Sequence, residues 1–279
     1  MKRFKNHLAL IFICAIFVGI YFLYKTLNYY PVQEITFFTQ AHEQLKRCGK
    51  NSFVLFDVDD VLITSPDYVA RGHLPLWVRL RLLWAFPGIL KESVAELVYS
   101  LGWQQAPRVL IEPLVVEVIN DIKQQGATVL GLTSMESGSY GVISSMPQWR
   151  ANMLKNMGIV FSQNYPNQMY TGLPLDRDKY PVLFEGILCT NQQPKGEVLA
   201  AFLDANNLHP AEIIFFDDSM SNLQSVGHAC SQRVIPCTLF LYRGSERFSN
   251  TLDSASIIRQ IDILMKEHRW VSDQEIAVL

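Results

Sequence analysis

The sequence lacks a net positive charge, a zinc-type cysteine pattern and any internal repeat. Its 24 lysines and arginines face 26 acidic residues, so the formal net charge is −2 at pH 7 and a broad basic surface for nucleic acid is not expected. Its five cysteines show no CxxC spacing, which argues against a structural zinc site. No low-complexity segment interrupts the chain, and 279 residues suffice for one large domain or for one domain with an inserted cap.

The cysteines leave two alternatives open. Cys14 lies in an apolar N-terminal segment, and the other four are Cys48, Cys189, Cys230 and Cys237. In an oxidising compartment they are compatible with one or two disulfides. Buried free thiols are equally compatible with the sequence.

The N-terminus carries an uncharged apolar run, Leu8–Tyr24, directly after the basic stretch MKRFKNH. The run is near the lower limit for a membrane span and longer than the usual core of a cleaved signal. We therefore predict that residues 1–30 are a transmembrane helix that acts as an uncleaved signal anchor. The excess of basic residues before the run places residues 31–279 on the periplasmic side of the inner membrane. The alternative is a cleaved signal that releases a secreted protein.

Short apolar runs alternate with helical patterns in the remainder of the chain. We predict buried strands at Phe53–Phe56, Ala127–Thr133, Ile213–Phe216 and Val234–Tyr242. We predict a hairpin at Val182–Cys189 and helices at Val32–Cys48, Ile111–Gln125, Pro147–Met157, Lys195–Asn207, Ser219–Ala229 and Thr251–His268. This alternation is typical of an α/β fold, here a Rossmann-like parallel sheet with helices on both faces. Residues from about 66 to 107 have the pattern of two or three further helices.

Polar side chains stand at the ends of three predicted strands. Asp57 and Asp59 follow the first strand, Thr133 ends the second, and Asp217 and Asp218 follow the third. Ligands bind at the carboxyl ends of parallel strands, so we expect these groups to lie together. Several carboxylates packed without compensation would repel one another. A bound Mg²⁺ removes that conflict, because it takes oxygen ligands and often completes its shell with a substrate phosphate.

Lys195 opens the helix before the third of these strands, where its ammonium can neutralise further negative charge. A carboxylate beside Mg²⁺ and a lysine can attack a phosphoryl group and form an aspartyl phosphate. A second carboxylate can protonate the leaving oxygen and later deprotonate water. The metal and Lys195 would stabilise the charge on the transferred phosphoryl group.

Four short motifs resemble those of the haloacid dehalogenase (HAD)-like phosphatase superfamily. In chain order they are DVDDVL (57–62), VLGLT (129–133), PKG (194–196) and FFDDSMSN (215–222). The resemblance covers about residues 51–242. It points to an uncharacterised bacterial branch, a domain of unknown function.

The resemblance implies a role for each motif residue. By it, Asp57 is the nucleophile and a metal ligand, and Asp59 is the acid/base, with its backbone carbonyl on the metal. Thr133 holds the phosphoryl oxygens and Lys195 stabilises the intermediate. The remaining implied residues are the metal-site carboxylates Asp217 and Asp218 and the supporting Asn222. The resemblance also implies that residues of about 66–107 form a small helical cap, inserted after the first strand, which selects substrates.

The sequence thus predicts a Mg²⁺-dependent phosphohydrolase that acts on a small phosphomonoester, with residues 31–279 as the catalytic domain. A phosphotransferase or phosphomutase with the same intermediate is a second reading. A catalytically silent, membrane-anchored interaction protein on the same scaffold is a third. The intact set of Asp57, Asp59, Lys195 and Asp217 argues against the third, because a silent copy is free to lose it.

Overall fold

The computed structural model describes residues 30–72, 90–248 and 251–278. The chain divides into two compact units, Met1–Pro31 and Val32–Leu279, and the architecture below is that of the second. The predicted N-terminal anchor and part of the predicted cap lie outside the described residues. Within the three described ranges, no helix combines the length and the apolar character needed to cross a bilayer.

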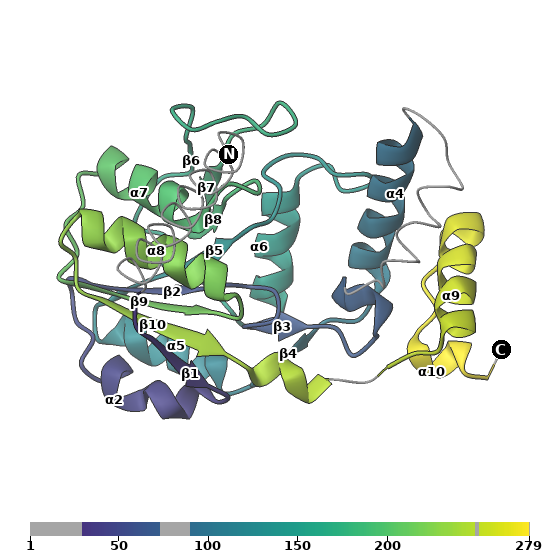
Figure 1. Ribbon diagram of the computed structural model, residues 1–279, viewed down its shortest axis with the longest axis horizontal. Coiled ribbons are helices and arrows are strands. Elements are labelled where there is room, and N and C mark those ends of the chain that lie inside the picture. The colour runs from purple at the N-terminus through teal and green to yellow at the C-terminus, as the bar shows by residue number, and fades with distance from the viewer. Residues whose placement is uncertain (1–29, 73–89, 249–250, 279) are drawn as a thin grey trace, which may run out of the picture. The chain divides into compact units, whose positions relative to one another are not determined.

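The second unit is built on an eight-stranded, mostly parallel sheet (Figure 1). The strand order is β1-β10-β9-β2-β5-β8-β7-β6, and β7 runs antiparallel to both of its neighbours. The strands are β1 (Val32–Ile35), β2 (Ser52–Phe56), β5 (Thr128–Thr133), β6 (Gln168–Met169), β7 (Val182–Phe184), β8 (Ile187–Cys189), β9 (Glu212–Asp217) and β10 (Cys237–Tyr242). The prediction of a mixed α/β fold with a mostly parallel central sheet is confirmed, and so is the predicted hairpin, which is β7 and β8.

Helices lie on both sides of this sheet. In Figure 1, α7 (Lys195–Ala205) and α8 (Met220–Gln232) lie on one side, and α2 (His42–Leu45) and α5 (Val115–Gln124) lie on the other. The other helices are α4 (Leu90–Gln105), α6 (Met146–Asn156), α9 (Ser254–Glu267) and α10 (Asp273–Ile276). The buried residues of α5 recur at three- and four-residue spacing, which is why one face of this helix packs inward.

The three central strands end in register at one edge of the sheet. In the pairing, Phe56 of β2 stands opposite Gly131 of β5 and Phe216 of β9. The next residue after Phe56 is Asp57, and the next after Phe216 is Asp217. This register places the strand-end groups that the sequence singled out at the same edge.

One predicted helix is wrong. Residues Val32–Cys48 do not form a continuous helix: they form β1, a 3-10 turn at Phe38–Ala41, and the short α2. β1 extends the sheet by pairing in parallel with β10, and the turn buries Phe38, whose ring stacks on Tyr242 with centroids 4.6 Å apart. Hydrogen bonding between β1 and β10 outweighs the local helical pattern here.

A second, two-stranded sheet marks where the chain leaves the main sheet and returns to it. Its strands are β3 (Ile63–Thr64) and β4 (Val109–Leu110), which pair antiparallel. The segment between them holds α4 and packs against the C-terminal α9. Asp67 secures this packing, because its carboxylate accepts hydrogen bonds from Trp270 Nε1 (2.7 Å) and from the Asp273 N–H (3.1 Å). This C-terminal contribution was not predicted from the sequence.

The cysteines of the described residues are free thiols. Cys48, Cys189 and Cys230 are buried, and Cys237 is half-buried. Of the two alternatives that the sequence left open, the structure has the free thiols.

Candidate functional site

A buried lysine joins two of the predicted strand-end carboxylates. The Nζ atom of Lys195 lies 2.8 Å from Asp57 Oδ1 and 2.7 Å from Asp217 Oδ2. Lys195 and Asp217 are almost fully buried, and Asp57 is 7% exposed. An ion pair removed from water to this degree persists only when its geometry is close and its other polar atoms are satisfied.

Lys195 reaches this position because α7 packs very closely on α8. Gly196 allows the approach: a Cβ atom there would lie 2.0 Å from the carbonyl oxygen of Ser225. The Gly196 N–H also donates to Ser225 Oγ at 3.0 Å. The glycine of the PKG motif is therefore required by the contact between the two helices, and this contact sets Lys195 over the strand ends.

Asp217 is the centre of the hydrogen bonds at this edge. Its Oδ1 accepts from the Ser219 N–H at 2.8 Å and from Asn222 Nδ2 at 3.0 Å. Its Oδ2 accepts from Lys195 at 2.7 Å and from Asn222 at 3.2 Å. Every oxygen of this fully buried carboxylate is thus satisfied by the start of α8 or by Lys195.

Asp218 completes a compact acidic group. Asp57, Asp217 and Asp218 each offer a carboxylate oxygen, and these atoms all lie within 4.8 Å of one another. One ammonium faces three carboxylates, so two negative charges stay without a partner. Among the described residues, no other group of three potential metal ligands comes together in this way.

The pKa shifts follow from this crowding. Burial raises the pKa of Asp57 well above 3.8, with Lys195 opposing the shift and Asp217 and Asp218 adding to it. Burial, reinforced by Asp217, raises the pKa of Asp218 to about 6. Burial alone would lower the pKa of Lys195, but Asp57 and Asp217 reverse this and raise it above 10.5. The lysine therefore stays charged, and the carboxylates favour a further cation.

These residues fit a divalent cation with oxygen ligands. In Asp57, Oδ1 already bonds to Lys195 and to the Val58 N–H (2.7 Å), while Oδ2 accepts no hydrogen bond from the described residues. Asp218 forms no ion pair within the same ranges. One oxygen of Asp57 and the carboxylate of Asp218 are therefore the available ligands, and small hard cations such as Mg²⁺ prefer such donors.

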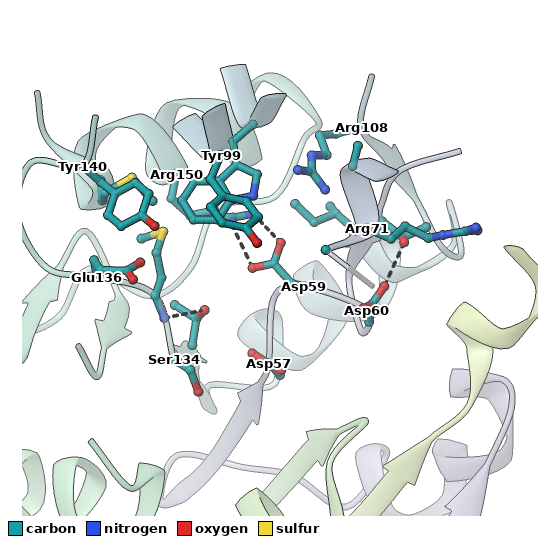
Figure 2. Close-up of a pocket in the computed structure, with 18 of the residues that line it drawn as sticks. Asp57, Asp59, Asp60, Arg71, Tyr99, Arg108, Ser134, Glu136, Tyr140 and Arg150 are labelled. Atoms are coloured by element: carbon teal, nitrogen blue, oxygen red, sulfur yellow. Dashed lines mark hydrogen bonds and ion pairs between the residues drawn. The ribbon is translucent and has the colours of Figure 1, made fainter. Parts of the chain in front are cut away.

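Asp59 lies apart from this acidic group. Its two oxygens accept hydrogen bonds from Arg150 of α6, at 3.0 Å from Nη1 and 2.8 Å from Nη2. The arginine side chain is 6% exposed, whereas the side chain of Asp59 is 46% exposed to the pocket. Figure 2 shows Asp59 directed toward Arg150, with Asp57 on its other side. The Asp59 side chain is thus held in the pocket and outside the carboxylate cluster.

Thr133 ends β5 and is buried beside the pocket. Its hydroxyl accepts a weak hydrogen bond from the Met135 N–H at 3.4 Å. The loop after Thr133 is held by backbone hydrogen bonds from the residues that follow β8. The Thr190 N–H donates to the Thr133 carbonyl, and the Gln192 N–H donates to the Ser134 carbonyl. Thr133 and Ser134 thus present hydroxyl groups to the same space as Asp57.

This space is a pocket of about 370 Å³. Asp57, Asp59 and Thr133 line the part formed by the sheet edge. The other lining residues include three arginines and three aromatic residues, which are Arg71, Arg108, Arg150, Tyr99, Trp103 and Tyr140. The volume suits a small molecule, and the lining combines charged groups with an apolar wall.

The sequence reasoning missed Arg150 and Arg108. Arg150 has a readable signal, because it stands four residues after Met146 and four before Leu154, on the buried face of α6. A lone arginine on such a face requires an acidic partner. Arg108 has no comparable signal, because it stands at the boundary between the insert and β4.

Comparison with known proteins identifies a family. The family model described as "Protein of unknown function (DUF2608)" matches residues 34–277. An uncharacterised protein of Rickettsia prowazekii is 23% identical over 253 residues, which cover 89% of this chain and 88% of the relative. A Chlamydia trachomatis protein named "Putative outer membrane protein" is 24% identical over 201 residues, 70% of each chain. A protein of the same name in Chlamydia muridarum is 24% identical over 205 residues, 72% of each chain.

The match corrects the assignment to the haloacid dehalogenase-like superfamily. The matching family is a different one, of unknown function, and the relatives carry no name from that superfamily. Four short motifs at strand ends were not sufficient for the assignment, because any parallel sheet that gathers acidic groups at one edge can carry similar residues. The prediction of a domain of unknown function is confirmed.

Proposed function

We propose a function for this chain, which belongs to the DUF2608 family of proteins of unknown function, from the geometry of its own site. The proposal is a Mg²⁺-dependent phosphohydrolase that cleaves a small phosphomonoester through an aspartyl phosphate. The observation that carries it is the buried Asp57–Lys195–Asp217 arrangement beside Asp218, whose Asp57 lines the pocket.

The first half of the reaction forms the intermediate. One carboxylate oxygen of Asp57 attacks phosphorus, and the bond from phosphorus to the leaving oxygen breaks. Asp59, which is held as a carboxylate by Arg150, first takes up a proton from solvent and then gives it to that oxygen. Lys195 and the hydroxyl of Thr133 stabilise the negative charge of the phosphoryl group.

The second half releases phosphate. Asp59, now ionised, takes a proton from water, whose oxygen attacks phosphorus and frees the carboxylate of Asp57. Arg150 acts here as a positioning residue, because it holds the Asp59 carboxylate inside the pocket. Asp57 and Asp218, with Asp217 behind them, would hold Mg²⁺, which supplies Lewis-acid stabilisation of phosphoryl charge when bound.

The test is hydrolysis of 4-nitrophenyl phosphate by the full-length protein, with Mg²⁺ and with EDTA. We expect turnover that requires Mg²⁺ and returns when the metal is restored. Turnover at the same rate in EDTA would contradict the metal requirement. No turnover of this compound or of a panel of small phosphomonoesters in Mg²⁺ would contradict the proposed function.

We also propose that residues 66–107 act as a cap. The support is that Tyr99, Trp103 and Arg71, all from this segment, line the same pocket as Asp57. Residues that line the pocket from an inserted segment are suited to selecting the substrate while Asp57 and Lys195 stay fixed at the sheet edge.

A location in the cell envelope is a further part of the proposal. It is supported by the apolar run Leu8–Tyr24 and by the names of the two chlamydial relatives. We expect protease added to spheroplasts to digest the domain formed by residues 32–279, because the anchor leaves it outside the cytoplasm. Full protection until the inner membrane is lysed would contradict this location.

A further inference from the structure

The pocket contains a charged side chain, that of Arg108, which the proposed reaction does not use. Arg108, next to β4, and Arg150, on α6, line the same 370 Å³ space as Asp57. In Figure 2, Asp57 lies on one side of Asp59, and the two arginines lie on the other. The pocket therefore has an acidic end at the sheet edge and a basic end opposite to it.

Arg108 has a buried donor that no described residue satisfies. Its Nε atom is buried without a hydrogen-bond partner, and the side chain makes no hydrogen bond or ion pair within the described ranges. The acidic groups that act on it electrostatically already accept hydrogen bonds from other side chains: Asp59 from Arg150, Asp60 from Thr64, and Asp67 from Trp270. A buried donor that lacks a partner in the protein is costly, and the rest of this guanidinium, which lines the pocket, remains for a ligand to bind.

The carboxylates around Arg108 are engaged elsewhere. Asp59 is paired with Arg150, and Asp60 and Asp67 act on Arg108 through space without a hydrogen bond to it. Glu136, another acid of the pocket, lies beside Tyr140 in Figure 2, away from Arg108. Burial lowers the pKa of Arg108 from its usual value, and the nearby carboxylates, Asp59 foremost, only partly oppose this shift.

We propose that the substrate is a phosphomonoester that carries a second anionic group, and that Arg108 binds this group while the phosphoryl group lies at Asp57. The second group is a carboxylate or a second phosphate, because a guanidinium binds two oxygens of either with paired hydrogen bonds. Trp103 and Tyr99, with ring centroids 6.0 Å apart, form the wall along which the connecting carbon atoms lie. This inference rests on the proposed function for the phosphoryl end of the molecule.

The test uses inert analogues, so that binding is measured without turnover. Three benzylphosphonates are compared by calorimetry with the full-length protein in Mg²⁺, and their para substituent is a carboxymethyl group, a phosphonomethyl group or a neutral carboxamidomethyl group. We expect both doubly anionic analogues to bind on the order of ten to a hundred times more tightly than the amide, the range for a hydrogen-bonded charged group.

Variants assign this preference to one side chain. In Arg108→Gln the affinity for the doubly anionic analogues, relative to the amide, should fall to about one. Arg108→Lys should keep part of this preference, because the charge remains and the paired geometry is lost. Arg259→Gln, on the exposed surface of α9, is the matched control and should keep the full ratio.

The outcomes separate this inference from the proposed function. Equal affinity for the three analogues, no binding of any of them, or an unchanged ratio in Arg108→Gln would overturn the inference. Hydrolysis of 4-nitrophenyl phosphate is scored separately. If the protein hydrolyses 4-nitrophenyl phosphate but binds the three analogues equally, only the second anionic group is refuted. If it prefers the doubly anionic analogues but does not hydrolyse phosphomonoesters, only the phosphohydrolase is refuted.

Discussion

Replacement of Asp57 by asparagine should lower Mg²⁺-dependent phosphomonoester hydrolysis by at least about a thousandfold, the scale seen when a nucleophile is removed. The amide keeps the size of the carboxylate but cannot attack phosphorus, and it removes the negative charge with which Lys195 pairs at 2.8 Å. The measurement is kcat/KM for 4-nitrophenyl phosphate in wild type and variant, purified in parallel. Thermal unfolding of both proteins establishes that the variant is folded.

The matched control is Asp121→Asn. Asp121 lies on the exposed side of α5 and does not line the pocket that contains Asp57, so the same loss of one charge should leave kcat/KM within about twofold, as expected for a distant surface change. If Asp57→Asn retained more than a tenth of the wild-type rate while the control behaved as expected, Asp57 would not be the nucleophile.

Replacement of Lys195 by methionine is expected to cost about 3–5 kcal/mol of folding stability in EDTA, the range for one partner removed from a buried ion pair. The ammonium is almost fully buried between Asp57 and Asp217, with Asp218 beside them, and methionine fills its volume without its charge. Two buried carboxylates and the half-buried Asp218 then face one another. The free energy of unfolding in urea measures this loss.

Mg²⁺ should restore part of the stability of Lys195→Met, because a cation that binds only the folded protein stabilises it by mass action. Lys155→Met, on the exposed side of α6, is the control and should change stability by no more than about 0.5 kcal/mol. If the two lysine variants lost equal stability, the account of a charge held between buried carboxylates would be wrong. If Mg²⁺ left the deficit of Lys195→Met unchanged, the carboxylates would not be a cation site.

The sequence predicted the residues of the site that lie at the carboxyl ends of the strands, because each of them is marked by its immediate neighbours in the chain. Asp57, Thr133 and Asp217 each end or follow a short apolar strand, and parallel strands in register deliver their ends to one edge. Lys195 was found because it opens the helix before β9, and the structure adds that Gly196 permits the close contact between α7 and α8. Each of these positions is specified within a few residues of chain.

The other half of the pocket was missed because distant segments build it. Arg150 meets Asp59 across 91 residues of sequence, and Trp270 meets Asp67 across 203. No local pattern encodes such pairs. The misread helix at Val32–Cys48 has the same cause, since β1 exists only through its pairing with β10, more than two hundred residues later. The side chain of Asp59 was predicted at the strand ends, but its position is decided by an arginine on another element.

The measurement that tests the central claim most directly is chemical trapping of the intermediate. Wild-type protein is quenched in acid during turnover of 4-nitrophenyl phosphate in Mg²⁺ and is then reduced with borohydride, which converts an aspartyl phosphate to homoserine. Peptide mass spectrometry locates the product. The account predicts homoserine at position 57 and its absence when EDTA replaces Mg²⁺. Turnover that leaves Asp57 unmodified, or homoserine at Asp59 or Asp218 in its place, would contradict it.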